Sequence, residues 1–238
     1  MDSGKVSKLL SEAIGTTLLV FIGCGVLVLD GGVLTISLAF GSVMCLCYYT
    51  FSQSSGCHLN PMLSLAFFIA GSLEAMDFVI YIIGQLIGCL VGAALLIPVL
   101  KSTDLGMQYL GSNFYGNKTP VHTKLFGAIY SETLLSLFFA YSVLCIYNNG
   151  HLKRIAGFLA GLMLTFVHLL GTRLTYTSVN PFRSFGPALF KCGDAIKKVW
   201  VFLVFPLLGG ASAGLLYKFF DMQMALAANS ASLPYFSA

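Results

Sequence analysis

Two asparagine–proline pairs and two isolated glutamates recur at one spacing in this chain. Asn60-Pro61 and Asn180-Pro181 lie 120 positions apart, as do Glu12 and Glu132, and each glutamate precedes its asparagine by 48 positions. Asparagine is preferred at the cap of a helix, and proline is favoured at the first helical position. Each pair therefore predicts the start of a helix. The positive ends of two such helices, aimed at one point, would repel cations and offer amide donors to a polar molecule.

Arg183 and His168 are further candidates, because they lie in or beside apolar segments. Arg183 stays protonated at any relevant pH and presents five donors in a rigid fork, so it can hydrogen-bond a passing molecule and repel cations. His168 lies in a run without Asp, Glu, Lys or Arg from 155 to 172, where it can narrow a passage and add a donor or an acceptor. An ionisable residue inside a membrane segment is expected to have a function.

The composition predicts that the surrounding solvent is lipid. Hydrophobic residues make up 57% of the chain and charged residues 9%, and the mean hydropathy is +0.86. A soluble domain carries about 25% charged residues. The net charge of +4 comes without a basic cluster of the kind that nucleic acid needs. These values exclude a soluble globular enzyme, a nucleic-acid-binding protein and a disordered chain, and they leave the lipid bilayer as the expected partner.

Long stretches with few charges predict six membrane crossings. A crossing helix needs about 20 mostly apolar residues. The candidates are roughly residues 9–29, 33–53, 78–100, 125–147, 155–172 and 199–219. We therefore predict an all-α polytopic membrane protein.

The offset of 120 positions predicts an internal repeat within a single transmembrane domain, residues 1–238. Repeat one covers about 9–100 and repeat two about 124–219. Each repeat holds three crossings, and an odd number inverts the second repeat relative to the first; inverted repeats commonly place a site near the membrane midplane. The apolar segments 61–70 and 181–190 are too short to cross. We expect two re-entrant half-helices that meet in mid-membrane, and hence a pore.

Motifs for catalysis or metal binding are missing from the sequence. The seven cysteines lie mostly in apolar runs, without Cys-x-x-Cys or Cys/His metal spacing. There is also no nucleophile–base pair and no phosphate-binding loop. We therefore expect neither an enzyme nor a bound cofactor or metal.

Six segments together resemble the aquaporin (major intrinsic protein) family. They are EAIGTTLLVF at 12–21, SLAFG at 37–41, SGCHLNP at 55–61, YIIGQLIG at 81–88, TSVNPFRSFGPA at 177–188 and VWVFLVFPLLGGASAG at 199–214. The resemblance covers the whole length. It implies six transmembrane helices with two re-entrant half-helices, a homotetramer in which each subunit has its own pore, and cytosolic termini. It also implies a location in the plasma membrane rather than an internal membrane.

The family's outer constriction combines an aromatic residue, a histidine, a small residue and an arginine. The resemblance assigns these places to Phe40, His168, Thr177 and Arg183. This set is similar to the filter of the water-selective branch, which passes single-file water and excludes protons and ions. The glycerol-conducting branch typically has glycine in place of the histidine and aspartate after the arginine, whereas Ser184 follows Arg183 here.

The same resemblance assigns roles to the loops before the two asparagines. Their backbone carbonyls are expected to line the water file, at Gly56, Cys57 and His58 and at Tyr176, Thr177, Ser178 and Val179. Glu12 and Glu132 are expected to be structural. A buried carboxylate can accept hydrogen bonds from loop N–H groups that would otherwise lack partners.

Three residues depart from the family pattern. The family's Asn-Pro-Ala is Asn60-Pro61-Met62 in the first repeat and Asn180-Pro181-Phe182 in the second, and Tyr176 replaces a small residue. At about 100° per residue, Phe182 lies about 160° from Asn180 around its helix. Met62 and Phe182 are therefore expected to face the protein interior, while Tyr176 could narrow the mouth.

Several functions remain open from the sequence. The first is a passive water channel, and the second is a coupled secondary transporter, since inverted repeats also build those. The third is a closed or low-conductance structural protein with the same fold, which Met62, Phe182 and Tyr176 keep open. Within the channel hypothesis, passage of ammonia, peroxide or another small neutral solute is also open.

Overall fold

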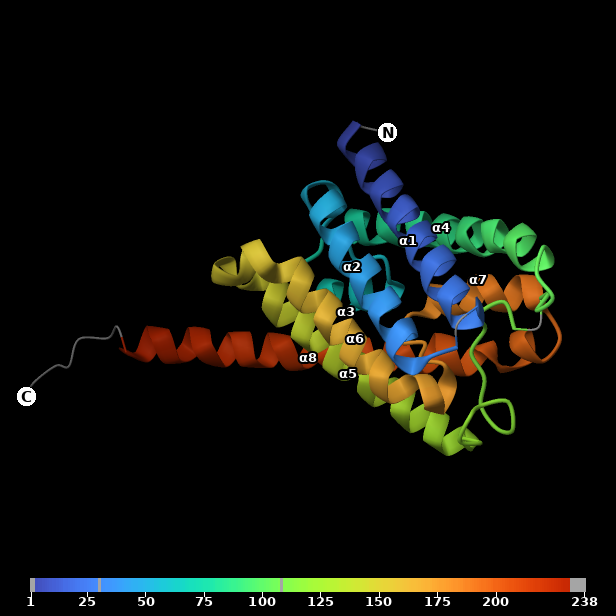
Figure 1. The fold of residues 1–238 in the computed structure, drawn as a ribbon. Helices are drawn as coiled ribbons and strands as arrows, with labels where there is room; N and C mark the ends of the chain where they lie inside the picture. The colour runs from blue at the N-terminus through green and yellow to red at the C-terminus, as the bar shows by residue number, and fades with distance from the viewer. Residues whose placement is uncertain (1–2, 30, 108, 232–238) are drawn as a thin grey trace, which may run out of the picture.

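A computed structural model of the chain describes residues 3–29, 31–107 and 109–231. These residues form eight α-helices and one short 3-10 helix and contain no strand (Figure 1). The elements are α1 (Ser3–Leu29), α2 (Val33–Ser55), α3 (Pro61–Ala70), α4 (Ala75–Lys101), α5 (Leu125–Asn148), η1 (Gly150–Ile155), α6 (Ala156–Thr175), α7 (Pro181–Lys191) and α8 (Asp194–Ala231).

The helices confirm the predicted all-α polytopic architecture. Six of those in the described ranges are long and apolar enough to cross a membrane, and they contain the six predicted spans almost entirely. The remaining two, α3 and α7, have 10 and 11 residues and begin at the proline that follows each asparagine. At 1.5 Å per residue they cannot cross a bilayer.

The last helix is longer than the sequence analysis expected. The predicted crossing ends at 219, but α8 continues to Ala231, and its last turns extend away from the other helices in Figure 1. Residues 220–231 are rich in Ala, Leu, Met and Gln and contain no Gly or Pro. Because these four are good helix formers, nothing in this stretch favours an earlier end.

The helices pack with the symmetry of an inverted repeat. Helix α1 packs against α4, and α5 packs against α8 in the same way, while α2 crosses α6 between the two halves. At that crossing Gly41 lies against Gly161, and a Cβ on either glycine would collide with the other's carbonyl oxygen. Each half-helix also packs against the last helix of the other half, α3 on α8 and α7 on α4. The small residues therefore let the two halves approach closely.

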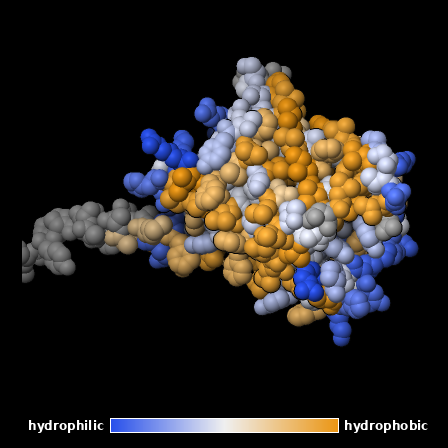
Figure 2. All heavy atoms as spheres, in the orientation of Figure 1, coloured by the Kyte–Doolittle hydropathy of each residue, from blue (hydrophilic) through white to orange (hydrophobic). Residues whose placement is uncertain are grey.

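Apolar side chains cover the outside of the bundle as well as its core. Hydrophobic residues dominate the middle of the face in Figure 2, and hydrophilic residues gather toward its two ends. Helix α4, for example, exposes a stripe of apolar side chains at helical spacing that includes Val79, Ile83, Ile87, Val91 and Leu95. An outward apolar surface of this extent fits a bilayer, and the chain is an integral multi-pass membrane protein.

Candidate functional site

The two half-helices begin with the same cap. Asn60 has an extended backbone, and its Oδ1 accepts a hydrogen bond from Met62 N at 2.9 Å. Asn180 is also extended, and its Oδ1 accepts from Phe182 N at 3.1 Å and Arg183 N at 3.2 Å. The amide oxygens thus satisfy N–H groups of the first turn, which leaves the amide nitrogens to point outward from each helix.

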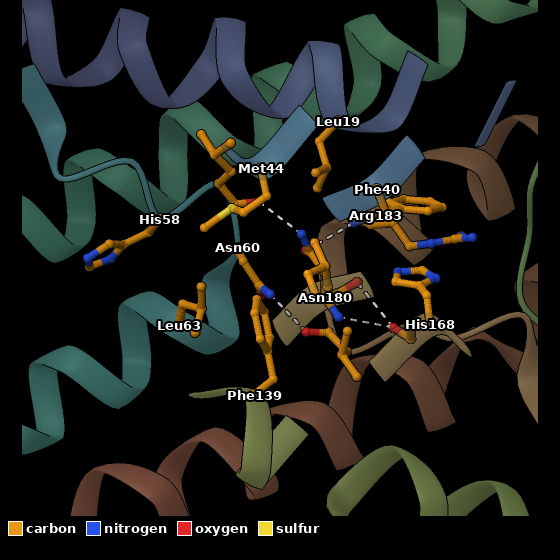
Figure 3. Close-up of a pocket in the computed structure, with 14 residues that line it drawn as sticks. Leu19, Phe40, Met44, His58, Asn60, Leu63, Phe139, His168, Asn180 and Arg183 are labelled. Carbon is orange, nitrogen blue, oxygen red and sulfur yellow. Dashed lines mark hydrogen bonds between the residues drawn. The ribbon is translucent and has the colours of Figure 1, made fainter. Parts of the chain in front are cut away.

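The amide nitrogens of the two asparagines are crossed between the repeats. Asn60 Nδ2 donates to the carbonyl of Val179 at 2.8 Å, and Asn180 Nδ2 donates to the carbonyl of Leu59 at 2.9 Å (Figure 3). Each nitrogen carries two hydrogens. One hydrogen of each amide therefore ties the two half-helices together, and the second is available to a molecule between them.

The two glutamates hold the loops that precede the asparagines. Glu12 accepts from Ser55 Oγ at 2.8 Å, His58 N at 2.9 Å and Leu59 N at 2.7 Å. Glu132 accepts the matching set 120 positions later, from Thr175 Oγ1 at 2.6 Å, Ser178 N at 2.9 Å and Val179 N at 3.0 Å. Both carboxylates are fully buried. They give partners to backbone N–H groups of the two loops, which would otherwise need other acceptors.

This support matters because the loop backbones are strained. Cys57 and Leu59 have φ of 57° and 53°, and Thr177 and Val179 repeat this pattern with 45° and 42°. The left-handed region costs a residue with a side chain roughly 1–2 kcal/mol. The glutamates hold the loops in this conformation through their N–H groups. In it, the carbonyls of Leu59 and Val179 accept hydrogen bonds from the asparagines.

A narrow cavity lies between the half-helices. Its volume is about 10 Å³, which is room for about one water molecule. Its lining residues fall into six pairs related by 120 positions, with Phe40 and His168 left over: Leu19/Phe139, Met44/Leu164, His58/Ser178, Leu59/Val179, Asn60/Asn180 and Leu63/Arg183. Aliphatic and aromatic side chains from α1, α2, α5 and α6 form part of the wall, and the asparagines and loop carbonyls supply the polar part (Figure 3).

Three of the four predicted filter residues meet at one end of this cavity. The rings of Phe40 and His168 are stacked, with centroids 4.1 Å apart and an angle of 10° between their planes. The Arg183 guanidinium carbon lies 5.1 Å from the centre of the Phe40 ring. Each of the three side chains is only 1% exposed. The rings are in contact, so together with the guanidinium they narrow this end of the cavity.

The guanidinium of Arg183 is fixed by the loop between α4 and α5. Its Nη1 donates to Gly111 O at 2.6 Å and to Asn113 Oδ1 at 2.8 Å, and Nη2 donates to Tyr176 O at 3.3 Å. Asn113 also donates to Thr175 O and accepts from Ser184. The sequence analysis did not identify Asn113 or Gly111, since an asparagine in a polar loop carries no periodic signal. It also missed Leu59, which the offset of 120 from Val179 could have found.

Two side-chain nitrogens at this end of the cavity have no hydrogen-bond partner within the described part of the chain. They are His168 Nδ1 and Arg183 Nε, and both are buried. A buried polar atom without a partner is costly. Both nitrogens belong to residues that line the cavity, so a water molecule held there could supply the missing hydrogen bonds.

Thr177 is oriented differently from the other three. It is buried, it does not line the cavity, and its side chain lies against Gly171. Its hydroxyl has no hydrogen-bond partner among the described residues. What Thr177 can offer a passage is its backbone, so its place in the filter stays a prediction.

The predicted carbonyl-lining residues lie in different surroundings. His58, Ser178 and Val179 line the central cavity. Gly56 lies in the wider vestibule beyond His58, and Cys57 is buried outside both spaces. The Tyr176 carbonyl is occupied by Arg183.

The Tyr176 side chain forms a strap to the α4–α5 loop near the end of the cavity where Arg183 lies. Burial raises the pKa of its hydroxyl, which therefore stays protonated and donates to Lys118 O at 3.0 Å. Lys118 in turn lies 2.7 Å from Asp194 at the start of α8. The large residue at this position thus ties the α4–α5 loop across the end where Arg183 lies.

Met62 and Phe182 both lie outside the cavity, but only Met62 faces the protein interior as expected. Met62 is fully buried against Gly210 of α8. Phe182 is half-buried in an apolar groove of about 420 Å³ with Pro61, Pro181 and Leu203. Neither side chain separates the two asparagines, which are joined through the loops.

The comparisons with known proteins agree with this arrangement. The family model for the major intrinsic protein matches residues 2–217. The chain is 37% identical over 225 residues to an aquaporin Z of Rhodopseudomonas palustris, covering 89% of this chain and 92% of that protein. It is 34% identical over 228 residues to an aquaporin Z of Bradyrhizobium diazoefficiens, covering 92% and 95%.

The chain belongs to the major intrinsic protein family. Members of this family are passive membrane channels rather than enzymes, and the same holds for this chain. A solved structure, the aquaglyceroporin from Plasmodium falciparum, superposes with a TM-score of 0.80 over 94% of this chain and 99% of that one. At 19% identity this likeness shows the shared fold. The crossed asparagines and the two half-helices thus lie within the fold of a channel family.

Proposed function

We propose that this chain forms a water-selective pore, which passes single-file water down an osmotic gradient and excludes protons, ions and glycerol. The observation that carries the proposal is the pair of crossed asparagine amides beside a cavity with room for about one water molecule. A water that accepts from both amides turns its hydrogens away from the half-helices. This orientation interrupts a chain of proton hops, and the two helix N-termini oppose cations.

We further propose that Phe40, His168 and Arg183, with the backbone of Thr177, select the permeant. The small volume of the cavity that these side chains line, about 10 Å³, supports exclusion of a three-carbon solute. The relatives that are 34% and 37% identical are named aquaporin Z, which also favours water.

We propose a homotetramer in the plasma membrane, in which residues 1–238 of each subunit form one domain built of repeats 9–100 and 124–219. The two-fold pattern of hydrogen bonds supports the repeats. The mass of the detergent-solubilised protein, measured by light scattering with the detergent contribution subtracted, tests the tetramer. A monomeric mass would contradict it. Fractionation of cells that express a tagged chain tests the membrane.

The function is tested by osmotic shrinkage of vesicles that contain the purified protein. We expect shrinkage, followed by light scattering, that is faster than in empty vesicles and has a low activation energy. We expect no glycerol entry in parallel, and no faster decay of an imposed pH gradient. Glycerol entry at the rate of water would overturn the selectivity, and a fast pH change would overturn proton exclusion.

A closed or low-conductance form is the second candidate, and a specific observation favours it. Phe40 and His168 are in contact, and Tyr176 straps the loop over the same end. Shrinkage no faster than in empty vesicles, by protein that is folded and tetrameric, would support this candidate. If Tyr176→Ala then restored fast shrinkage, the strap would be the cause.

A further inference from the structure

His58 separates two spaces on the axis of the site. It lines the narrow central cavity and also a vestibule of about 450 Å³ on the side of the α3–α4 turn. Its side chain is 3% exposed and is packed against Phe67, with centroids 4.4 Å apart, and edge-on to Tyr81 at 5.0 Å. Anything that moves between vestibule and cavity passes this ring, so which of its nitrogens carries the proton matters.

A series of hydrogen bonds that begins at Glu12 indicates which nitrogen of His58 carries the proton. The Glu12 carboxylate accepts from Ser55 Oγ, His58 N and Leu59 N, and a fourth donor, Gln85 Nε2, lies 2.8 Å from its Oε2. Four donors around one carboxyl group match the ionised form, which only accepts hydrogen bonds. The Gln85 amide must therefore turn its nitrogen toward Glu12, because the reverse orientation would bring two acceptor oxygens together.

The same nitrogen of Gln85 continues this series of hydrogen bonds. It donates its other hydrogen to Ser64 Oγ at 2.9 Å. The Ser64 hydroxyl then has its own hydrogen to give, and His58 Nδ1 lies 3.2 Å from it. The arrangement that uses this hydrogen has Ser64 donating to Nδ1, with the ring proton on Nε2. The His58 Nε2 atom lies near Gly56, on the vestibule side.

We propose that Gln85 and Ser64 are positioning residues that hold His58 in its Nε2–H tautomer, so that the ring presents a donor, and no free acceptor, at the constriction between vestibule and cavity. The consequence for passing water rests on the proposed function. A ring with a free acceptor nitrogen could take a proton from the water file. With Nδ1 filled by Ser64, His58 offers passing water only a donor, as do the asparagine amides.

The second repeat has no such arrangement, which gives the proposal an internal control. Ser178 occupies the place of His58, and Ser184 occupies the place of Ser64. Ser184 Oγ lies 2.6 Å from Ser178 Oγ and 2.8 Å from Asn113 Oδ1, and Phe205 stands where the first repeat has Gln85. A substitution at Ser184 removes the equivalent hydroxyl and leaves the Gln85–Ser64–His58 chain intact.

The test is nitrogen-15 NMR of histidine-labelled full-length protein in lipid bilayers, which distinguishes protonated from unprotonated ring nitrogens. The His58 signals are assigned by their loss in His58→Gln. We expect the Nε2–H form in the unaltered protein. In Ser64→Ala the Nδ1 acceptor loses its donor, and in Gln85→Leu the Ser64 oxygen becomes free to accept from the ring. Each change should raise the ratio of Nδ1–H to Nε2–H about five-fold, the effect of losing one ordinary hydrogen bond.

Ser184→Ala should leave the His58 signals unchanged. An Nδ1–H ring in the unaltered protein, or an unchanged ratio in both Ser64→Ala and Gln85→Leu, would overturn the proposal. Osmotic shrinkage of the same preparations separates this result from the function itself. An Nε2–H ring in protein that conducts no water would remove the proposed function and leave the assignment of the tautomer standing.

Discussion

Leu63 and Arg183 occupy equivalent positions, three residues after the capping asparagine of each half-helix. Five other pairs around the cavity keep the same symmetry, but this pair replaces an aliphatic side chain with a cation. Phe40 and His168, the two lining residues without a counterpart in the lining, gather around the cation. In the proposed channel, the side chains that would discriminate between permeants therefore gather at one end of a symmetric passage.

Removing two of these side chains should change the selectivity between water and glycerol. In Arg183→Ala combined with His168→Ala, the contact between rings and the guanidinium fork are both lost, so we expect a wider passage. Glycerol entry into vesicles should rise by about ten-fold or more, the discrimination that a few close contacts supply. Arg173→Ala, at an exposed arginine in the last turn of α6, is the matched control. Unchanged exclusion of glycerol in the double variant would count against the assignment of these residues.

Asn113 should matter to stability as well as to the position of Arg183. In Asn113→Ala the buried groups of Arg183, Ser184 and Thr175 each lose a partner. An unsatisfied buried group costs about 1–3 kcal/mol, so we expect a lower thermal unfolding midpoint in detergent. Asn117→Ala, at an exposed position of the same loop, should unfold like the unaltered protein. Equal midpoints for the two variants would show that Asn113 does not hold the arginine.

At the scale of elements, each half-helix lines the cavity with one face and packs against other helices with the opposite face. Asn180 and Arg183 line the cavity from α7, while Phe182 packs in an apolar groove with Pro61 and Leu203. The helical period of about 100° per residue accounts for this division. The bulky residues that follow each Asn-Pro pair thus belong to the packing of α3 and α7.

Phe182→Ala should therefore leave the water selectivity intact. The loss of stability should be smaller than the about 3–5 kcal/mol of a fully buried phenylalanine, because this ring is only half-buried. Shrinkage of vesicles in sucrose and entry of glycerol measure the selectivity. A marked gain of glycerol entry would mean that α7 is rotated relative to the register described here.

The elements could be predicted from sequence more fully than the contacts of their side chains. Asn-Pro pairs mark the starts of α3 and α7, because a cap and a first-turn proline are local signals. Thr177 could not be oriented, since its φ of 45° is set by the hold of Glu132 on the loop. The partnership of Asn113 with Arg183 joins residues 70 positions apart and depends on the path of an irregular loop. The extension of α8 was missed because hydropathy marks the crossing and not the end of the helix.

At the scale of the whole molecule, neither half is complete by itself. The half-helix α3 packs against α8, α7 packs against α4, and the asparagine amides reach across to the opposite loop. Within each half, by contrast, the glutamate binds its own loop. The contacts that shape each loop are thus local, whereas each half-helix packs against both halves, α7 on its own α8 as well as on α4.

This division predicts the behaviour of the separate halves. Residues 1–120 expressed alone should aggregate on size-exclusion chromatography in detergent, because α3 lacks α8 and Asn60 lacks its acceptor. Co-expressed with residues 121–238, they should co-purify through a tag on either half. A monodisperse first half with α3 protected from protease would contradict this expectation.

The docking of α3 on α8 also sets an order for synthesis and membrane insertion. Helix α3 ends at Ala70 and α8 begins at Asp194, so at about 5–20 residues per second a ribosome needs on the order of ten seconds to supply the partner. During that time the strained loop before Asn60 lies at membrane depth without the second half. Glu12 and Ser55 have then already been made, and they can accept hydrogen bonds from the N–H groups of this loop. The Glu12 carboxylate of α1 would thus first hold this loop in the nascent chain, well before any water passes.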